Sequence, residues 1–102
     1  MRRLALGSIL LCLTLVGCRA DPNPIGAELQ AASSGLVASY TTDEGNFLDP
    51  PRVYLTLVPA AKSSEVHALW CDVVIPTLDR EHVDVEIGIQ DSSGAPLDTG
   101  DC

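Results

Sequence analysis

Residues 83–90 read VDVEIGIQ, in which apolar side chains alternate with charged, amide or small ones along the whole stretch. The apolar side chains would point to one face of a strand, and the others would point to the opposite face. This period of two is typical of a strand with one buried face and one face in water. The stretch therefore predicts a β-sheet.

Three further segments carry the same signal in weaker form. Residues 52–58 place alternate valine and leucine side chains on one face, and residues 36–42 alternate in a similar way. Residues 65–75 are rich in β-branched side chains with a less regular alternation, which predicts a central strand or one bulged near Cys71. Turn-forming residues separate the segments, at 43–46, 59–64, 76–82 and 91–94.

Short strands at this spacing predict an all-β domain over residues 36–102, either a small antiparallel β-sandwich or a partly open barrel of four to five strands. So few strands leave a sheet edge that could pair with a partner strand. Residues 18–35 begin with alternating prolines and end in Ser-Ser-Gly, which predicts a flexible tether. The alternative is a short helical turn over residues 25–32 that docks Leu29 on the domain.

The first residues have the organisation of a secretory signal. Arg2 and Arg3 form a basic start, residues 4–16 are apolar, and Gly17 is a small residue before a cysteine. A helix of this apolar length rises only about 20 Å, whereas the hydrocarbon core is about 30 Å thick. Residues 1–17 are therefore predicted to be a signal peptide that is removed, and not a membrane-spanning helix.

The segment Leu15-Val16-Gly17-Cys18 resembles the lipobox of bacterial lipoproteins, and the resemblance covers these positions and the signal before them. It implies that Cys18 becomes the first mature residue and carries acyl chains that anchor the protein in the cell envelope. Because Arg19 stands where an aspartate commonly retains a lipoprotein in the inner membrane, the outer membrane is favoured in a Gram-negative cell. The alternative is an ordinary secretory cut after Ala20.

The mature chain is strongly acidic. Removal of Arg2 and Arg3 with the signal leaves four of the six basic residues against 14 acidic ones, a side-chain net charge of −10. This charge repels nucleic acid and anionic lipid headgroups and attracts cationic partners. It indicates a basic protein partner, or simply an acidic surface that keeps a small exported domain soluble.

The cysteines fall into two groups after processing. Cys12 leaves with the signal and Cys18 carries the lipid, so Cys71 and Cys102 remain. In an oxidising compartment this pair predicts one disulfide, whose loop of about 30 residues contributes roughly 3–4 kcal/mol. Two free thiols, or an intermolecular bridge through Cys102, are the alternatives.

Catalytic and metal-binding signals are weak. His67 and His82 are far apart in the chain, and the acidic loops at 43–49 and 91–101 lack the ligand spacing of a calcium loop. No nucleophile motif is present, and so small a domain offers little room for a water-excluded pocket. We therefore expect no enzyme activity, no cofactor and no bound metal.

The candidate binding residues are Trp70 and Tyr54, which supply two of the four aromatic side chains. An exposed Trp70 would be a binding anchor, whereas a Trp70 that covers the disulfide would belong to the core. The sequence thus favours a non-catalytic, envelope-anchored lipoprotein with a binding or structural role. The two alternatives are an inhibitor of a basic secreted hydrolase such as lysozyme, by analogy in size and charge, and a calcium-dependent surface or adhesion module.

Overall fold

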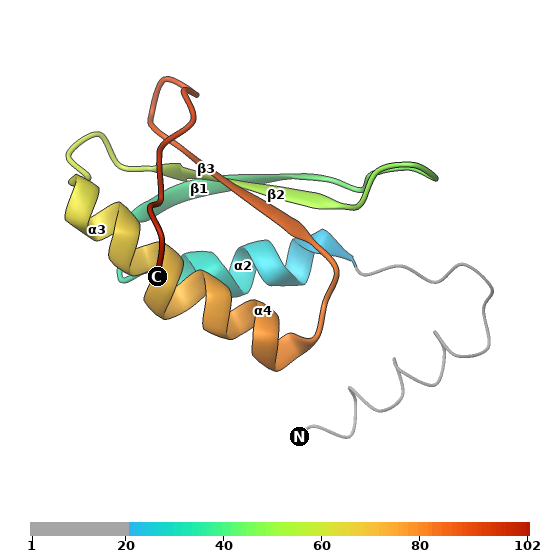
Figure 1. The fold of residues 1–102 in the computed structure, drawn as a ribbon. Coiled ribbons are helices and arrows are strands. Elements are labelled where there is room, and N and C mark those ends of the chain that lie inside the picture. The colour runs from blue at the N-terminus through green and yellow to red at the C-terminus, as the bar shows by residue number, and fades with distance from the viewer. Residues whose placement is uncertain (1–20) are drawn as a thin grey trace.

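The computed structural model describes residues 21–102, which form one layer of helices on one face of a three-stranded sheet (Figure 1). The sheet has the order β1-β2-β3. β2 is antiparallel to β1 and parallel to β3. The strands are β1 (Val37–Asp43), β2 (Arg52–Leu57) and β3 (Glu86–Gln90).

The helices are α2 (Pro22–Ala32) and one long stretch between β2 and β3. That stretch begins as α3 (Ser63–Ala68), widens into the π-helix η1 (Leu69–Val74) and ends as α4 (Ile75–Glu81). The N–H of Ile75 donates to the carbonyl oxygen of Trp70, five residues earlier. Pro76 lacks a backbone N–H and its ring crowds the preceding turn, and a local π turn is one way in which a helix accommodates this.

The core lies between the sheet and the helices. The central strand β2 contributes Val53, Leu55 and Leu57, all fully buried, while the alternate residues of β2 face the open side of the sheet. The rest of the buried apolar cluster comes from α2, β1, α3, η1 and β3 and from the segment before β3. Its members are Ile25, Leu29, Val37, Val66, Leu69, Val74, Val85 and Ile89.

The prediction of an all-β sandwich or barrel is wrong, because residues 65–75 are helical and the sheet is mixed. The apolar side chains of this segment that are buried, Val66, Leu69 and Val74, recur at spacings of three to five residues. That spacing fits one face of a helix, so the β-branched composition indicated the wrong element. Because this helix connects β2 to β3 across the sheet, β3 returns parallel to β2.

The flexible tether predicted before the domain is also wrong, since residues 22–32 form α2, and the alternative of a helical segment that docks Leu29 on the domain is confirmed. Asp21 is its N-cap, and a carboxylate oxygen of Asp21 accepts a 3.0 Å hydrogen bond from the backbone N–H of Asn23. Pro22 occupies the first helical position, where a proline costs no hydrogen bond. Leu29 is 0% exposed, so α2 forms one wall of the core.

The predicted lipobox, Leu15 to Cys18, lies outside the described residues. From residue 21 onward, no helix has both the length and the apolar character needed to cross a bilayer.

The burial of α2 predicts that Leu29→Ala lowers the free energy of unfolding by about 2–5 kcal/mol, because a large side chain leaves the core. Leu48→Ala makes the same chemical change at a position that is 86% exposed, and it should leave the free energy within about 0.5 kcal/mol. Denaturant titration of both variants measures the difference. Equal stability of the two variants would mean that α2 does not belong to the core.

Candidate functional site

The candidate site is a groove between β3, the C-terminal segment after it, and the π-helix η1. Its volume is about 440 Å³. The groove brings together Tyr54 and Trp70, the two residues that the sequence singles out for binding. Its remaining lining residues are Ile87, Gly88, Ile89, Gln90, Gly94, Pro96, Leu97 and Thr99.

Tyr54 lies over a glycine of the neighbouring strand. The parallel register pairs Tyr54 of β2 with Gly88 of β3, so both residues belong to the same face of the sheet. A Cβ atom at Gly88 would stand 3.0 Å from Cδ1 of Tyr54, which is tighter than an ordinary contact. Gly88 therefore leaves room for the tyrosine ring to lie against the strand and to reach the groove.

Trp70 comes from the layer of helices. It lies in η1 and is partly buried against the apolar core, with the remainder of its surface at the groove. Trp70 therefore contributes both to the core and to the lining of the groove. Because Tyr54 stands on the open face of the sheet and Trp70 on the helix side, the groove has an aromatic ring on each side of β3.

The edge of β3 that lines the groove is only partly covered. The N–H of Leu97 donates to the carbonyl oxygen of Ile89 over 2.9 Å on the side away from β2. The N–H of Glu86 points to the other side, where it donates to Pro51 over 2.9 Å. By the alternation of a strand, the N–H and C=O of Ile87 face the groove, and no backbone group between residues 21 and 102 bonds to them there.

The C-terminal segment forms the outer wall of the groove. After a turn at residues 91–95 it forms an antiparallel bridge with the end of β3, between Gln90 and Pro96. The carboxylate of Asp91 accepts hydrogen bonds from Ser93 and from the N–H of Ala95 within this turn. The hydrogen bond from Ser93, together with that from the backbone of Ala95, lowers the pKa of Asp91 below its ordinary value.

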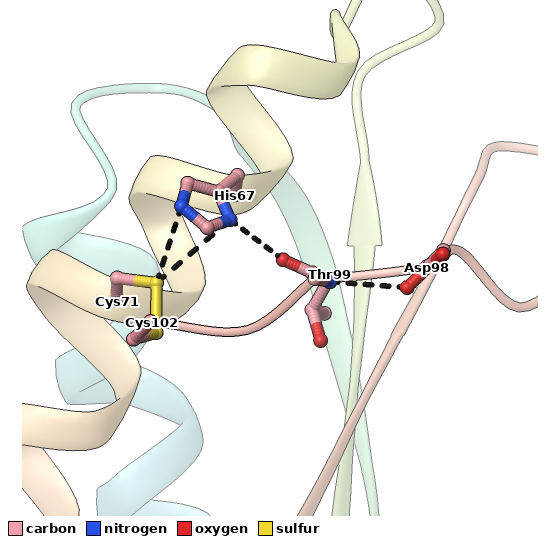
Figure 2. The surroundings of a disulfide bond; sticks show 6 residues. His67, Cys71, Asp98, Thr99 and Cys102 are labelled. Carbon is pink, nitrogen blue, oxygen red and sulfur yellow. Dashed lines mark hydrogen bonds between the residues drawn. A yellow bond between two sulfur atoms is a disulfide. The ribbon is translucent and has the colours of Figure 1, made fainter.

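The last residues of the segment are fastened to the helix (Figure 2). Cys102 forms a disulfide with Cys71 of η1, with 5.5 Å between their Cα atoms. Nδ1 of His67 lies 3.0 Å from the carbonyl oxygen of Thr99, and Nε2 of His67 lies 3.6 Å from Sγ of Cys71. The disulfide and this histidine therefore hold the outer wall of the groove against the helix α3–η1.

One charged pair and one neutral polar pair connect β2 and β3 on the open face of the sheet. Nε of Arg52 donates a 2.9 Å hydrogen bond to Oε1 of Glu86, and this bond raises the pKa of Arg52 above its ordinary value. Further along the strands, the amide of Gln90 donates to the hydroxyl of Thr56 over 2.9 Å. These cross-strand pairs follow the parallel register and align β3 with β2.

The structure offers no cluster with the composition of a metal site within residues 21–102. Asp43, Asp91 and Asp98 each accept a backbone N–H two residues further along the chain, so these loop carboxylates form turns. His82 ends α4 in the left-handed region at φ 53°, and His67 contacts the C-terminal segment. The two histidines therefore serve different parts of the fold.

A second hollow of about 500 Å³ lies between the end of α2, the start of the loop after β2, and the helix α3–η1. Small and apolar side chains line most of it, together with the carboxylates of Glu65 and Asp72. Glu65 already accepts a 2.8 Å hydrogen bond from the N–H of Lys62 at the start of α3. None of the residues predicted for binding lies in this hollow.

Sequence reasoning missed one conspicuous surface, the tip of the loop between β1 and β2. Phe47 and Leu48 are 97% and 86% exposed. Two adjacent large apolar side chains inside a turn-forming stretch, between Gly45-Asn46 and Asp49-Pro50, are the signal that could have identified it.

The comparisons with known proteins provide no relative. No family model, no curated protein and no solved structure matches the chain. Its function therefore has to be argued from the geometry.

The disulfide predicts a measurable loss of stability when it is absent. The double variant Cys71→Ala with Cys102→Ala should unfold with a free energy about 3–4 kcal/mol lower, because the unfolded chain is no longer closed into a loop. Denaturant titrations with and without reductant measure this. Reductant should lower the free energy of unfolding of the wild-type chain to that of the variant and leave the variant's unchanged. A wild-type stability that does not respond to reductant would contradict the disulfide.

Proposed function

We propose that the protein is a non-catalytic lipoprotein of the cell envelope whose acidic domain binds an extended, basic segment of a partner protein. The observation that carries the proposal is the groove, in which Tyr54 and Trp70 flank the free backbone edge at Ile87. A backbone donor and acceptor between two aromatic surfaces is an arrangement suited to a peptide in strand conformation.

The geometry supports a strand added to β3. Backbone groups of such a strand would bond to the N–H and C=O of Ile87, which supplies affinity without regard to sequence. Successive side chains of a strand point to opposite faces, so one set would meet Tyr54 and the other set would meet Trp70. The two aromatic rings would therefore contact alternate side chains of the bound segment.

The charge of the domain selects a basic partner. Among the described cations, Arg52 pairs with Glu86, and Arg80 pairs with Glu28 over 2.6 Å. Because only four basic side chains stand against 14 acidic ones in the mature chain, the field of the domain is negative. A basic hydrolase such as lysozyme remains one candidate partner of this kind.

The anchor would be the lipid on Cys18, with the outer membrane as the favoured location in a Gram-negative cell. The lipobox resemblance and the signal before it support this part of the proposal. The disulfide between Cys71 and Cys102 agrees with an oxidising compartment outside the cytoplasm.

The anchor is tested by intact mass spectrometry of the protein extracted from membranes after expression of the whole gene. We expect a chain that starts at Cys18, carries acyl chains and gains the mass of two hydrogen atoms on reduction of the disulfide. Cys18→Ser should appear unacylated, because the thioether cannot form. A wild-type product that begins at Asp21 without acyl groups would refute the lipoprotein proposal.

The groove is tested with a capped octapeptide of alternating lysine and valine, and with its glutamate–valine counterpart as the control. The lysine peptide should shift the amide resonances of Ile87 and Gly88 and change the fluorescence of Trp70. Added salt should weaken the binding of this peptide. Ile87→Pro removes the N–H that faces the groove and should weaken binding about fivefold more than Ile87→Ala does. Equal binding of both peptides, or shifts confined to other surfaces, would contradict the proposal.

A further inference from the structure

The loop between β1 and β2 holds two large apolar side chains in water. Phe47 and Leu48 are almost completely exposed, and the next most exposed large apolar residue of the described chain, Ile75, is only 38% exposed. Figure 1 shows this loop extending beyond the end of the sheet. Exposure of this kind is unfavourable in water and indicates a surface that is covered in the functional state.

The loop has a defined conformation. Oδ1 of Asn46 accepts hydrogen bonds from the N–H groups of Leu48 and Asp49, at 2.7 and 2.9 Å. The N–H of Asn46 donates in turn to the carbonyl oxygen of Asp49 over 3.0 Å. Gly45 has φ +75°, and a Cβ atom there would stand 2.5 Å from that same oxygen. Phe47 and Leu48 are therefore presented by a turn whose backbone is already fixed.

The position of the loop in the fold indicates what covers it. The hydroxyl of Thr42, near the end of β1, donates to Oδ1 of Asn23 over 3.4 Å. Asn23 belongs to the first turn of α2, so the loop and the start of α2 lie at the same end of the molecule (Figure 1). The turn at residues 91–95 follows the far end of β3 and lies at the opposite end.

The length of the chain before α2 ties this end to the proposed anchor. Three peptide units separate Cys18 from Asp21, and consecutive Cα atoms are about 3.8 Å apart, so the span is at most about 11 Å. If Cys18 carries the lipid, the start of α2 and the loop beside it must lie at the membrane surface. This step rests on the lipid anchor of the proposed function.

We propose that Phe47 and Leu48 insert into the bilayer interface and form a second membrane contact beside the lipid. The lipid holds the loop within reach of the bilayer, so insertion is an intramolecular step at high effective concentration. A phenyl ring and a leucine side chain suit the boundary between headgroups and acyl chains. Two contacts fix the orientation of the domain, with the 91–95 turn and the outer end of the groove directed away from the membrane.

The acidic side chains of the loop indicate the headgroup charge of the lipid that it contacts. Asp43, Glu44 and Asp49 flank the apolar tip, and an anionic headgroup would repel them. The proposed contact is therefore with zwitterionic lipid. A protein pocket with a basic rim would also fit an acidic apolar tip, and that occupant is the contrary outcome of the test.

The test couples residues 18–102 to vesicles through Cys18, the only thiol outside the disulfide in that chain. The thiol reacts with a maleimide lipid in phosphatidylcholine vesicles that contain brominated phosphatidylcholine. Phe47→Trp places an indole at the tip, Ser92→Trp places one in the turn at the opposite end, and the wild-type chain gives the signal of Trp70 alone.

The added indole of Phe47→Trp should emit at shorter wavelength on the vesicles and lose most of its intensity to bromine. The indole of Ser92→Trp should do neither. Replacing half of the phosphatidylcholine by phosphatidylglycerol, or adding Leu48→Ser to Phe47→Trp, should reduce the quenching. An indole at position 47 that emits as in water and is not quenched would overturn the proposal and leave the tip to a protein partner.

This experiment tests the insertion of the loop independently of the lipid anchor on Cys18. Coupling is chemical, so the vesicle result does not depend on whether cells attach a lipid to Cys18. An unacylated mass from cells refutes the anchor, whereas an unquenched indole at the tip of the coupled protein refutes the insertion. Circular dichroism of each variant in solution confirms that the exposed substitutions leave the fold intact.

Discussion

The burial of β2 on one face is the constraint on which the rest of the structure depends. Val53, Leu55 and Leu57 are fully buried, and a single strand cannot cover three such side chains itself. Both helices therefore lie on the same face of the sheet, α2 before the strands and the α3–η1–α4 stretch between β2 and β3 (Figure 1). The opposite face stays in water, where polar cross-strand pairs and Tyr54 occupy it.

The crossing of the long helix determines where binding surfaces can form. It brings β3 back parallel to β2 as an edge strand, and the C-terminal segment then covers only the outer part of that edge. The groove is the gap that remains between strand, segment and helix. At the other end of the same strands, the loop with Phe47 and Leu48 lies at the same end of the domain as the start of α2. The end proposed for the anchor and the end that holds the groove are thus different ends of one small domain.

The alternation of apolar residues predicted the three strands, and it is clearest in β2, where every second side chain is buried. The strand prediction failed for residues 65–75, where β-branched residues occur at the spacing of a helix. The prolines at 22 and 24 indicated a tether, although Pro22 begins a helix. Tyr54 and Trp70 could be named from the sequence, but the groove that joins them depends on the path of the C-terminal segment. Phe47 and Leu48 belong to no periodic pattern of apolar residues, so periodicity does not predict their role.

The π turn before Pro76 sets the relative rotation of the two halves of the long helix. Each residue advances an α-helix by about 100°, so one extra residue in a turn changes the direction in which every later side chain points. The half before the π turn faces the C-terminal segment through His67, while the half after it reaches α2 through Arg80. Removing one residue from Leu69–Val74 would restore ordinary winding and break this division. For this segment, length is therefore under a tighter structural constraint than composition.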